Sequence, residues 1–445
     1  MDPERLRRVP FLPRPGGSPL AIDRAEGAYL ITSDGRRILD AAGGAIVVNI
    51  GHGRREVAEA VAEATTRTSY LVPPFVTESR LRLVERLLDR WLPDGLERVL
   101  LTSGGSEAMD AAVRIARQHQ IACGRENRYK IIGRDLSYHG TTIGTLAIGG
   151  HEKRRADFAP LLPPHPKAPA CYCLRCPLDR SYPECGAACA RELEQIIARE
   201  GADTIAAFVA EPISGSGAGA LVPPAEYWPQ VAEICKRHDI LVIADEVMTG
   251  FGRTGRRFAV EHFDLEPDLL VSGKGLSGGY APICGIFARD DVVRPISERG
   301  LDVMFYTYGA HSASCAAADK VLEIMERESL VERAAELGER LAKRLDGLRE
   351  HPHVADVRGR GLLWAIELVE DRDTLAPFPE DAGVTGKVVA SGLSQGVFFY
   401  PGGSGAARDI VVLGPPFTIG DTELDLIADV LPRAIDEAVA RVRDR

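Results

Sequence analysis

Short apolar runs recur along the middle of the chain, and they are rich in β-branched side chains. They occupy residues 97–103, 128–135, 204–212, 239–247, 267–273 and 283–290. Continuous apolar runs of this kind are typical of strands that are buried on both faces. Segments with helical periodicity separate several of the runs, as at residues 106–121 and 225–238. This alternation predicts an α/β fold in which helices cover both faces of a mostly parallel sheet.

The two ends of the chain show a different pattern. Near the N-terminus, residues 27–40 resemble a hairpin with a turn at Asp34 and Gly35. Toward the C-terminus, residues 330–350 carry apolar positions at the spacing of an amphipathic helix. We therefore predict that both ends join in one smaller α+β domain packed beside a large domain. The predicted division is 1–50 and 328–445 for the small domain and 51–327 for the large domain.

Composition and charge narrow the class of protein. The 445 residues are 45% apolar and 27% charged, which is enough for two globular domains with substantial cores. The net charge of -10 disfavours a partner that is a nucleic acid or an anionic membrane, so a small-molecule partner is expected. The sequence has no long uncharged apolar stretch and no apolar signal segment near its start. We therefore expect a cytoplasmic protein.

Five of the nine cysteines lie close together in the sequence. They are Cys171, Cys173, Cys176, Cys185 and Cys189. Their C-x-C-x2-C-x8-C-x3-C spacing is within reach of a zinc or iron site but matches no standard one. A surface loop with free thiols or one disulfide is favoured, and a bound metal stays open. A metal-binding regulatory protein organised around this cluster is the alternative from a different functional class.

Polar residues that suit catalysis follow the predicted strands. In open α/β sheets the ligand lies beyond the carboxyl ends of the strands, so these residues should meet in one crevice. They are Gly104, Gly105, Ser106, Tyr138, His139, Glu211, Asp245, Glu246 and Lys274. Glycines and a serine at a strand-to-helix junction can bind an anion through backbone N–H groups. A lysine among glycines at a buried bend is costly, which indicates that it has a chemical role.

Together these residues could hold pyridoxal 5'-phosphate. The lysine would react with the aldehyde of the cofactor, the carboxylate would keep its ring nitrogen protonated, and the glycines would seat its phosphate. Nearly the whole chain also resembles the class III pyridoxal-phosphate aminotransferases of fold type I. The motifs that carry the resemblance include TSGGSEA, SYHG, AEPISG, ADEVMTGFGRTG, SGKGLSGG and YTYGAH.

The resemblance implies specific roles around the cofactor ring. Lys274 forms a Schiff base with the cofactor and then moves the substrate proton. Asp245 pairs with the ring nitrogen, while Val247 and Tyr138 cover the two faces of the ring. Glu211 lies near substrate and cofactor.

The same resemblance places the phosphate and the second subunit. His139 is also expected at the cofactor, although both His139 and Glu211 could equally be scaffold residues. Gly105 and Ser106 are expected to hold the phosphate together with Thr307. In this family Thr307 comes from the partner subunit, which implies a homodimer or a tetramer formed as a dimer of dimers.

Departures from well-known members of the family fall where substrates are chosen. Met248 stands where ornithine and 4-aminobutyrate enzymes usually have a glutamine. Ile46 replaces a tryptophan that often lids the pocket, and Tyr400 aligns with the usual carboxylate-binding arginine. Arg408 is the nearby substitute, and Arg358 and Arg360 are expected to lie nearer the scaffold of the small domain.

The predicted reaction moves an amino group to a 2-oxo acid. The donor would be an amine or an omega-amino acid, and the acceptor would be a compound such as pyruvate. A racemase or an aminomutase on the same cofactor remains the alternative, because the motifs fix the first proton transfer but not the later steps. No metal is assigned a role in this reaction.

Overall fold

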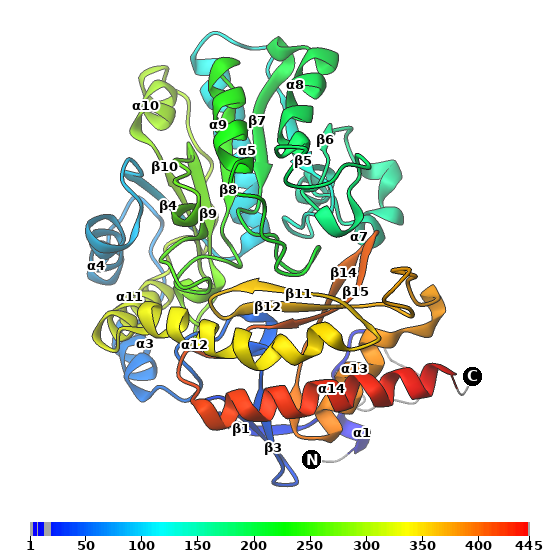
Figure 1. The fold of residues 1–445 in the computed structure, drawn as a ribbon. Coiled ribbons are helices and arrows are strands. Elements are labelled where there is room, and N and C mark those ends of the chain that lie inside the picture. The colour runs from blue at the N-terminus through cyan, green and yellow to red at the C-terminus, as the bar shows by residue number, and fades with distance from the viewer. Residues whose placement is uncertain (1–2, 7, 13–18, 444–445) are drawn as a thin grey trace.

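The computed structural model describes residues 3–6, 8–12 and 19–443. Its upper part in Figure 1 is built on a seven-stranded sheet. In spatial order the strands are β4 (Arg98–Thr102), β10 (Cys284–Ala288), β9 (Leu269–Ser272), β8 (Leu241–Asp245), β7 (Ile205–Ala210), β5 (Lys130–Arg134) and β6 (Lys167–Ala168). Only β10 runs antiparallel to its neighbours, and the other pairs are parallel. The predicted mostly parallel sheet is confirmed.

Helices cover both faces of this sheet. Successive residues of a strand point to opposite faces, and in β8 Leu241 and Ile243 join one apolar cluster while Val242 and Ala244 join the other. The first cluster contains α5 (Gly105–Ala122) and α10 (Asp290–Glu298). The second contains α8 (Ala188–Glu200) and α9 (Tyr227–Arg237). Burial on both sides explains why the strand sequences show no polar alternation.

The two ends of the chain meet in the lower part of Figure 1. One sheet there has the order β1 (Ile22–Glu26), β2 (Tyr29–Thr32), β3 (Arg37–Asp40) and β13 (Val397–Phe398), so strands from both chain ends pair directly. The hairpin between β2 and β3 forms as expected, with Gly35 in the left-handed region at φ +88°. The exact division at residues 50 and 328 stays a prediction.

A second four-stranded sheet lies beside the first. Its order is β11 (Val354–Arg360), β12 (Leu363–Leu368), β15 (Ala407–Leu413) and β14 (Tyr400–Ser404), all antiparallel. The helices of this C-terminal part are α12 (Leu330–Leu345), α13 (Val384–Ser394) and α14 (Asp421–Arg443). The remaining α-helices are α1 (Pro3–Leu6), α2 (Gly43–Ile46), α3 (Arg55–Arg67), α4 (Glu78–Arg86), α6 (Ile143–Ile148), α7 (Glu152–Ala156) and α11 (Ser312–Arg327).

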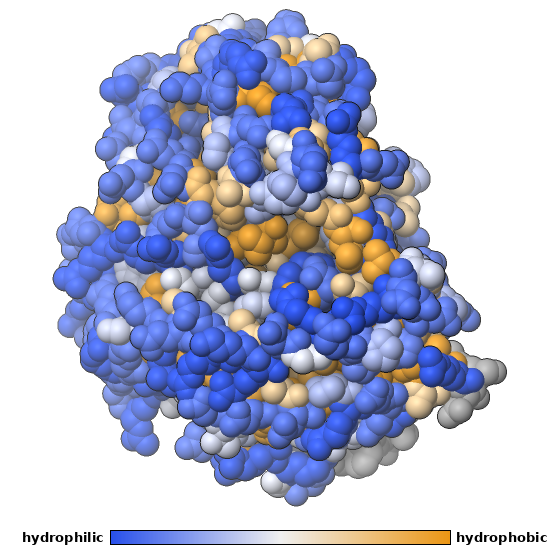
Figure 2. Space-filling view, viewed as in Figure 1, coloured by the Kyte–Doolittle hydropathy of each residue, from blue (hydrophilic) through white to orange (hydrophobic). Residues whose placement is uncertain are grey.

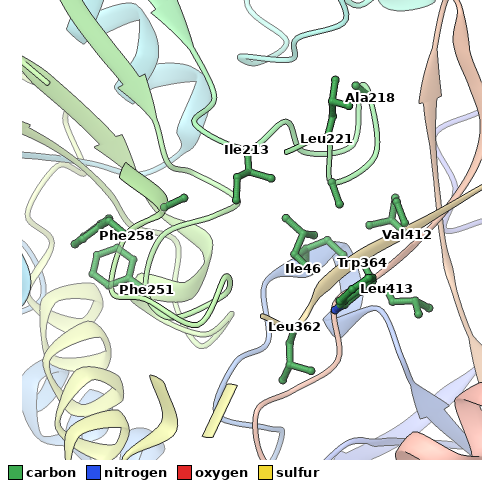
Figure 3. Packing of buried hydrophobic residues seen from close by; sticks show 14 of the residues in the cluster. Ile46, Ile213, Ala218, Leu221, Phe251, Phe258, Leu362, Trp364, Val412 and Leu413 are labelled. Atoms are coloured by element: carbon green, nitrogen blue, oxygen red, sulfur yellow. The ribbon is translucent and has the colours of Figure 1, made fainter. Parts of the chain in front are cut away.

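The upper and lower parts pack on an apolar seam. Figure 3 shows Ile213 and Leu221 on one side, and Ile46, Trp364 and Val412 on the other. Hydrophobic residues gather along the middle of the face in Figure 2, where the surface is hollowed. No helix within the described residues is both long and apolar enough to cross a membrane.

One buried arginine, Arg253, connects the upper and lower parts across the seam. Arg253 donates hydrogen bonds to the carbonyl oxygens of Val48 at 3.3 Å, Leu362 at 3.1 Å and Pro415 at 2.7 Å. Its guanidinium also lies 4.6 Å from the ring centre of Phe417. Burial lowers the pKa of Arg253 to about 9. The loop after β8 is thereby connected to segments from both chain ends.

Candidate active site

A cavity of about 220 Å³ opens beyond the carboxyl ends of the parallel strands. Eight of the predicted site residues line it: Gly105, Ser106, Tyr138, His139, Glu211, Asp245, Val247 and Lys274. They lie at the ends of five strands, β4, β5, β7, β8 and β9, or in the segments that follow them, which is how residues far apart in the sequence come together. Of the nine residues expected to meet in one crevice, seven line this cavity, whereas Gly104 and Glu246 do not. The buried carboxylate of Glu246 instead accepts hydrogen bonds from Thr249 and from the N–H of Val260.

Lys274 follows β9 in a constrained backbone conformation. Its φ of +40° lies in the left-handed region, which costs free energy for a residue with a side chain. A Cβ atom on the preceding residue, Gly273, would lie 2.1 Å from the sulfur of Cys284, so only glycine fits there. Burial lowers the pKa of Lys274, and the charge of Asp245 acts in the opposite direction. A lysine in this setting loses its proton more easily than one in water.

Asp245 is held by two donors at the end of β8. The Nδ1 atom of His139 donates to Oδ2 of Asp245 at 2.7 Å, and the backbone N–H of Val247 donates to Oδ1 at 3.0 Å. Both side chains are nearly inaccessible to solvent. The sequence did not indicate this pairing, because a His at the end of one strand and an Asp at the end of another carry no mark of contact. His139 is therefore a direct neighbour of the predicted ring partner.

Glu211 contacts the backbone of Tyr138 and a buried arginine. Its Oε1 accepts the backbone N–H of Tyr138 at 3.2 Å, and its Oε2 lies 3.6 Å from the guanidinium of the buried Arg134. Burial raises the pKa of Glu211, while His139 and Arg134 oppose the shift. Arg134 also donates to the carbonyl oxygen of Glu211 at 2.8 Å. These contacts fix the segment that carries Tyr138 against the strand end that carries Glu211.

The first turn of α5 offers free backbone donors to the cavity. Gly104 caps the helix without a side-chain hydrogen bond, and α5 continues for 18 residues, so its N-terminus is electropositive. A Cβ atom on Gly105 would lie 3.2 Å from Val247, so the glycine lets the two segments approach closely. The hydroxyl of Ser106 accepts the N–H of Thr141 at 3.0 Å. This arrangement suits a phosphate group.

Comparison with known proteins gives the family. The profile of the family described as aminotransferase class-III matches residues 13–435. The chain belongs to the class-III aminotransferases. It is 34% identical over 428 residues to putrescine–pyruvate aminotransferase of Pseudomonas aeruginosa, a match that covers 95% of this chain and 91% of that protein. It is 36% identical over 385 residues to taurine–pyruvate aminotransferase of Bilophila wadsworthia, covering 84% and 82% of the two chains.

Solved structures agree with this assignment. The omega transaminase of Pseudomonas jessenii in complex with PMP superposes with a TM-score of 0.92 at 31% identity, and the match covers 99% of both chains. An (S)-enantioselective omega-transaminase from Thermomicrobium roseum superposes with a TM-score of 0.88 at 34% identity, over 99% of this chain and 95% of that one. The class-III aminotransferase fold therefore extends over the whole described chain.

The cofactor of this aminotransferase is pyridoxal 5'-phosphate, and the cavity fits it. The buried Nε2 atom of His139 and Oε2 atom of Glu211 make no hydrogen bond to any described residue. Both atoms are therefore available to a polar ligand in the cavity. A lysine of lowered pKa, a buried aspartate and a helix N-terminus with free donors match the aldehyde, the ring nitrogen and the phosphate.

Four predicted residues of the aminotransferase do not line the cavity. Thr307 is exposed, in the segment between α10 and α11. Ile46 is buried on the seam, facing the side of Ile213 (Figure 3). Tyr400 is half-buried in β14.

Arg408, the fourth, lies in β15 and is engaged elsewhere. It donates to Glu380 at 3.2 Å and to the carbonyl oxygen of Phe378. Arg358 is paired with Glu367 at 2.7 Å and with Asp356 at 2.9 Å, in keeping with its expected place in the scaffold.

All nine cysteines of the chain are free thiols in the structure. Cys171 is buried, with its sulfur 3.9 Å from the guanidinium of Arg134, and Cys173 is exposed. Among the residues that the structure describes, no group of three or more His, Cys, Asp or Glu side chains could hold a metal ion. The arrangement gives no support to a metal centre at the cysteine cluster.

Proposed function

We propose that this aminotransferase moves an amino group from an amine or an omega-amino acid to a 2-oxo acid such as pyruvate, in two alternating half-reactions. The observation that carries the proposal is that the half-buried Lys274 and the buried Asp245–His139 pair line one cavity. The printed activities of relatives, putrescine–pyruvate and taurine–pyruvate aminotransferase, support the substrate classes.

Each residue of the cavity has its own role in the proposed reaction. The bound cofactor supplies an aldehyde that condenses with amines and a ring that withdraws electrons from the substrate carbon. Lys274 accepts the proton from that carbon and later returns one, and its lowered pKa keeps the neutral amine accessible for the first step. Asp245 would accept the hydrogen bond of the protonated ring nitrogen, and His139 holds the Asp245 carboxylate in place. Tyr138 excludes water from one side of the cavity.

We further propose that the enzyme works as a homodimer or as a pair of such dimers. The segment that contains Thr307 exposes large apolar side chains: Met304 is 64% exposed, Phe305 52% and Tyr308 64%. Tyr308 contacts Tyr70, with ring centres 6.2 Å apart. Phe75 and Val76, which follow Tyr70 closely in the sequence, are also exposed. An apolar patch of this kind is typical of an interface. In this arrangement Thr307 would reach the phosphate of the partner subunit.

The reaction is tested by following both products. Purified enzyme loaded with the cofactor is incubated with pyruvate and a panel of amines and omega-amino acids. We expect alanine to form in a one-to-one ratio with the carbonyl product of the donor, and Lys274→Ala to form none. Conversion of a donor without any alanine would favour a racemase or an aminomutase and would contradict the proposed function.

A further inference from the structure

A second hollow of about 240 Å³ lies next to the catalytic cavity. Its walls come from α7 and its flanking residues, from the start of α13 and from the β14–β15 hairpin. Ser216 lines both spaces, so the hollow and the cavity meet at this residue. Ser216 is therefore the place where a molecule that reacts at Lys274 would reach the hollow.

The hollow carries an excess of positive charge. Its charged side chains are Lys153, Arg154, Arg408, Glu380 and Asp409. Arg408 forms ion pairs with both carboxylates, at 3.2 Å from Glu380 and 3.5 Å from Asp409. Among the described residues, no carboxylate lies within ion-pair distance of Lys153 or Arg154. The hollow thus offers two cations to an incoming anion.

Arg154 is an exposed residue of the hollow that contacts a residue of the catalytic cavity. Its guanidinium lies over the ring of Tyr138, 4.3 Å from the ring centre, and Tyr138 lines the catalytic cavity. The charge of Arg154 also acts to lower the pKa of Lys274, although burial has the larger effect. His151, at the start of the same helix, has its pKa lowered to about 4 by burial and by Arg154 and Lys153, so it adds no charge.

Two residues that line the hollow have unused polar atoms. His151 Nδ1 and Thr385 Oγ1 are buried and make no hydrogen bond to any described residue. Buried polar atoms without partners are uncommon in folded proteins. Two of them in the wall of one hollow favour a polar occupant.

We propose that the hollow is a second substrate subsite, which binds a carboxylate at the far end of the amine donor, with Arg154 as its anion-binding residue. The inference rests on the proposed aminotransferase function and narrows its donor class to amines with a distal acid group. The carboxylate of the acceptor is bonded to the reacting carbon, so it stays inside the cavity. The sequence prediction for Arg408 concerned a different group, the carboxylate of the 2-oxo acid acceptor.

The test compares donors of equal length with and without the acid group. With pyruvate as acceptor, 4-aminobutyrate is compared with butylamine, and 6-aminohexanoate with hexylamine. We expect Arg154→Gln to raise the KM of one or both amino acids about 10-fold, and to change the KM of the plain amines and of pyruvate by less than about 2-fold. Arg154→Lys should restore part of the loss, since it keeps the charge but not the planar fork.

A matched control and a second readout separate binding from structure. Arg441→Gln removes an exposed arginine from α14 and should leave all KM values unchanged. The change in cofactor absorbance when donor is added without pyruvate should need more 4-aminobutyrate in Arg154→Gln, but no more butylamine.

Four outcomes would contradict parts of the proposal. An equal effect on both donors of a pair would mean that Arg154 only positions Tyr138, and an increase confined to pyruvate would place the acceptor in the hollow. Wild-type enzyme that accepts the plain amines but neither amino acid would also overturn the subsite. Wild-type enzyme that forms no alanine from any amine would contradict the proposed function itself.

Discussion

At the scale of single residues, the pairing of Asp245 with His139 carries the clearest consequence. Asp245→Asn keeps the shape of the side chain but removes the charge that faces the ring nitrogen. We expect kcat/KM to fall by at least about 100-fold, because a buried charge interaction of this kind is worth about 3 kcal/mol in the transition state. His139→Asn, whose amide can still donate to Asp245, should lose less activity. Wild-type rates in Asp245→Asn, measured by alanine formation, would show that another carboxylate serves the ring.

Glu246, next to Asp245, should make stability depend on pH. Burial raises its pKa to about 7 from an ordinary value of 4.5, although Thr249 and the N–H of Val260 donate to it. Between these two values the folded protein holds a proton that the unfolded chain has released, so stability falls as the pH rises. The wild type should lose about 3 kcal/mol relative to Glu246→Gln between pH 5 and pH 8. Urea denaturation at both pH values measures this, and parallel profiles would contradict it.

The sequence could predict which residues meet but not how they touch. Lys274, Asp245, Tyr138 and Glu211 each follow a buried strand, and the geometry of a parallel sheet brings such positions together. The contact between His139 and Asp245, and that between Arg154 and Tyr138, depend on side-chain directions set by packing. Arg154 lies in a run of exposed charges, a pattern that by itself indicates only a solvated helix face.

At the scale of elements, strand burial made the large sheet predictable. The runs that became β7, β8, β9 and β10 are buried along their whole length, so their apolar pattern is unbroken. The pairing of β13 with β3 joins segments about 360 residues apart, and no local pattern marks a two-residue strand. The antiparallel placement of β10 also depends on topology rather than on composition.

Arg253 should be a main stabilising contact between these elements. Arg253→Leu would leave the carbonyl oxygens of Val48, Leu362 and Pro415 without their donor inside the seam. We expect the free energy of unfolding to drop by at least about 3 kcal/mol. Arg257→Leu is the matched control, because that guanidinium is half exposed and should cost less than about 1 kcal/mol. Equal urea midpoints for the two variants would contradict the role of Arg253.

At the scale of the whole molecule, the exposed apolar patch near Thr307 predicts the assembly. Tyr308→Asp, combined with Met304→Asp, places charges in the middle of the proposed interface. We expect light scattering after gel filtration to report half the wild-type mass, together with a loss of activity because Thr307 no longer reaches the partner's phosphate. Tyr129→Asp, at a tyrosine that is 57% exposed elsewhere, should change neither. A double variant that keeps both its mass and its activity would contradict this interface.

The central claim is that Lys274 is the residue that binds the cofactor covalently. Borohydride treatment of the cofactor-loaded enzyme fixes this bond, and mass spectrometry of the digested protein then locates it. We expect the label on the peptide that contains Lys274 and on no other lysine, with no label at all in Lys274→Ala. A label on a different lysine, or an unchanged yield of label in Lys274→Ala, would contradict the account.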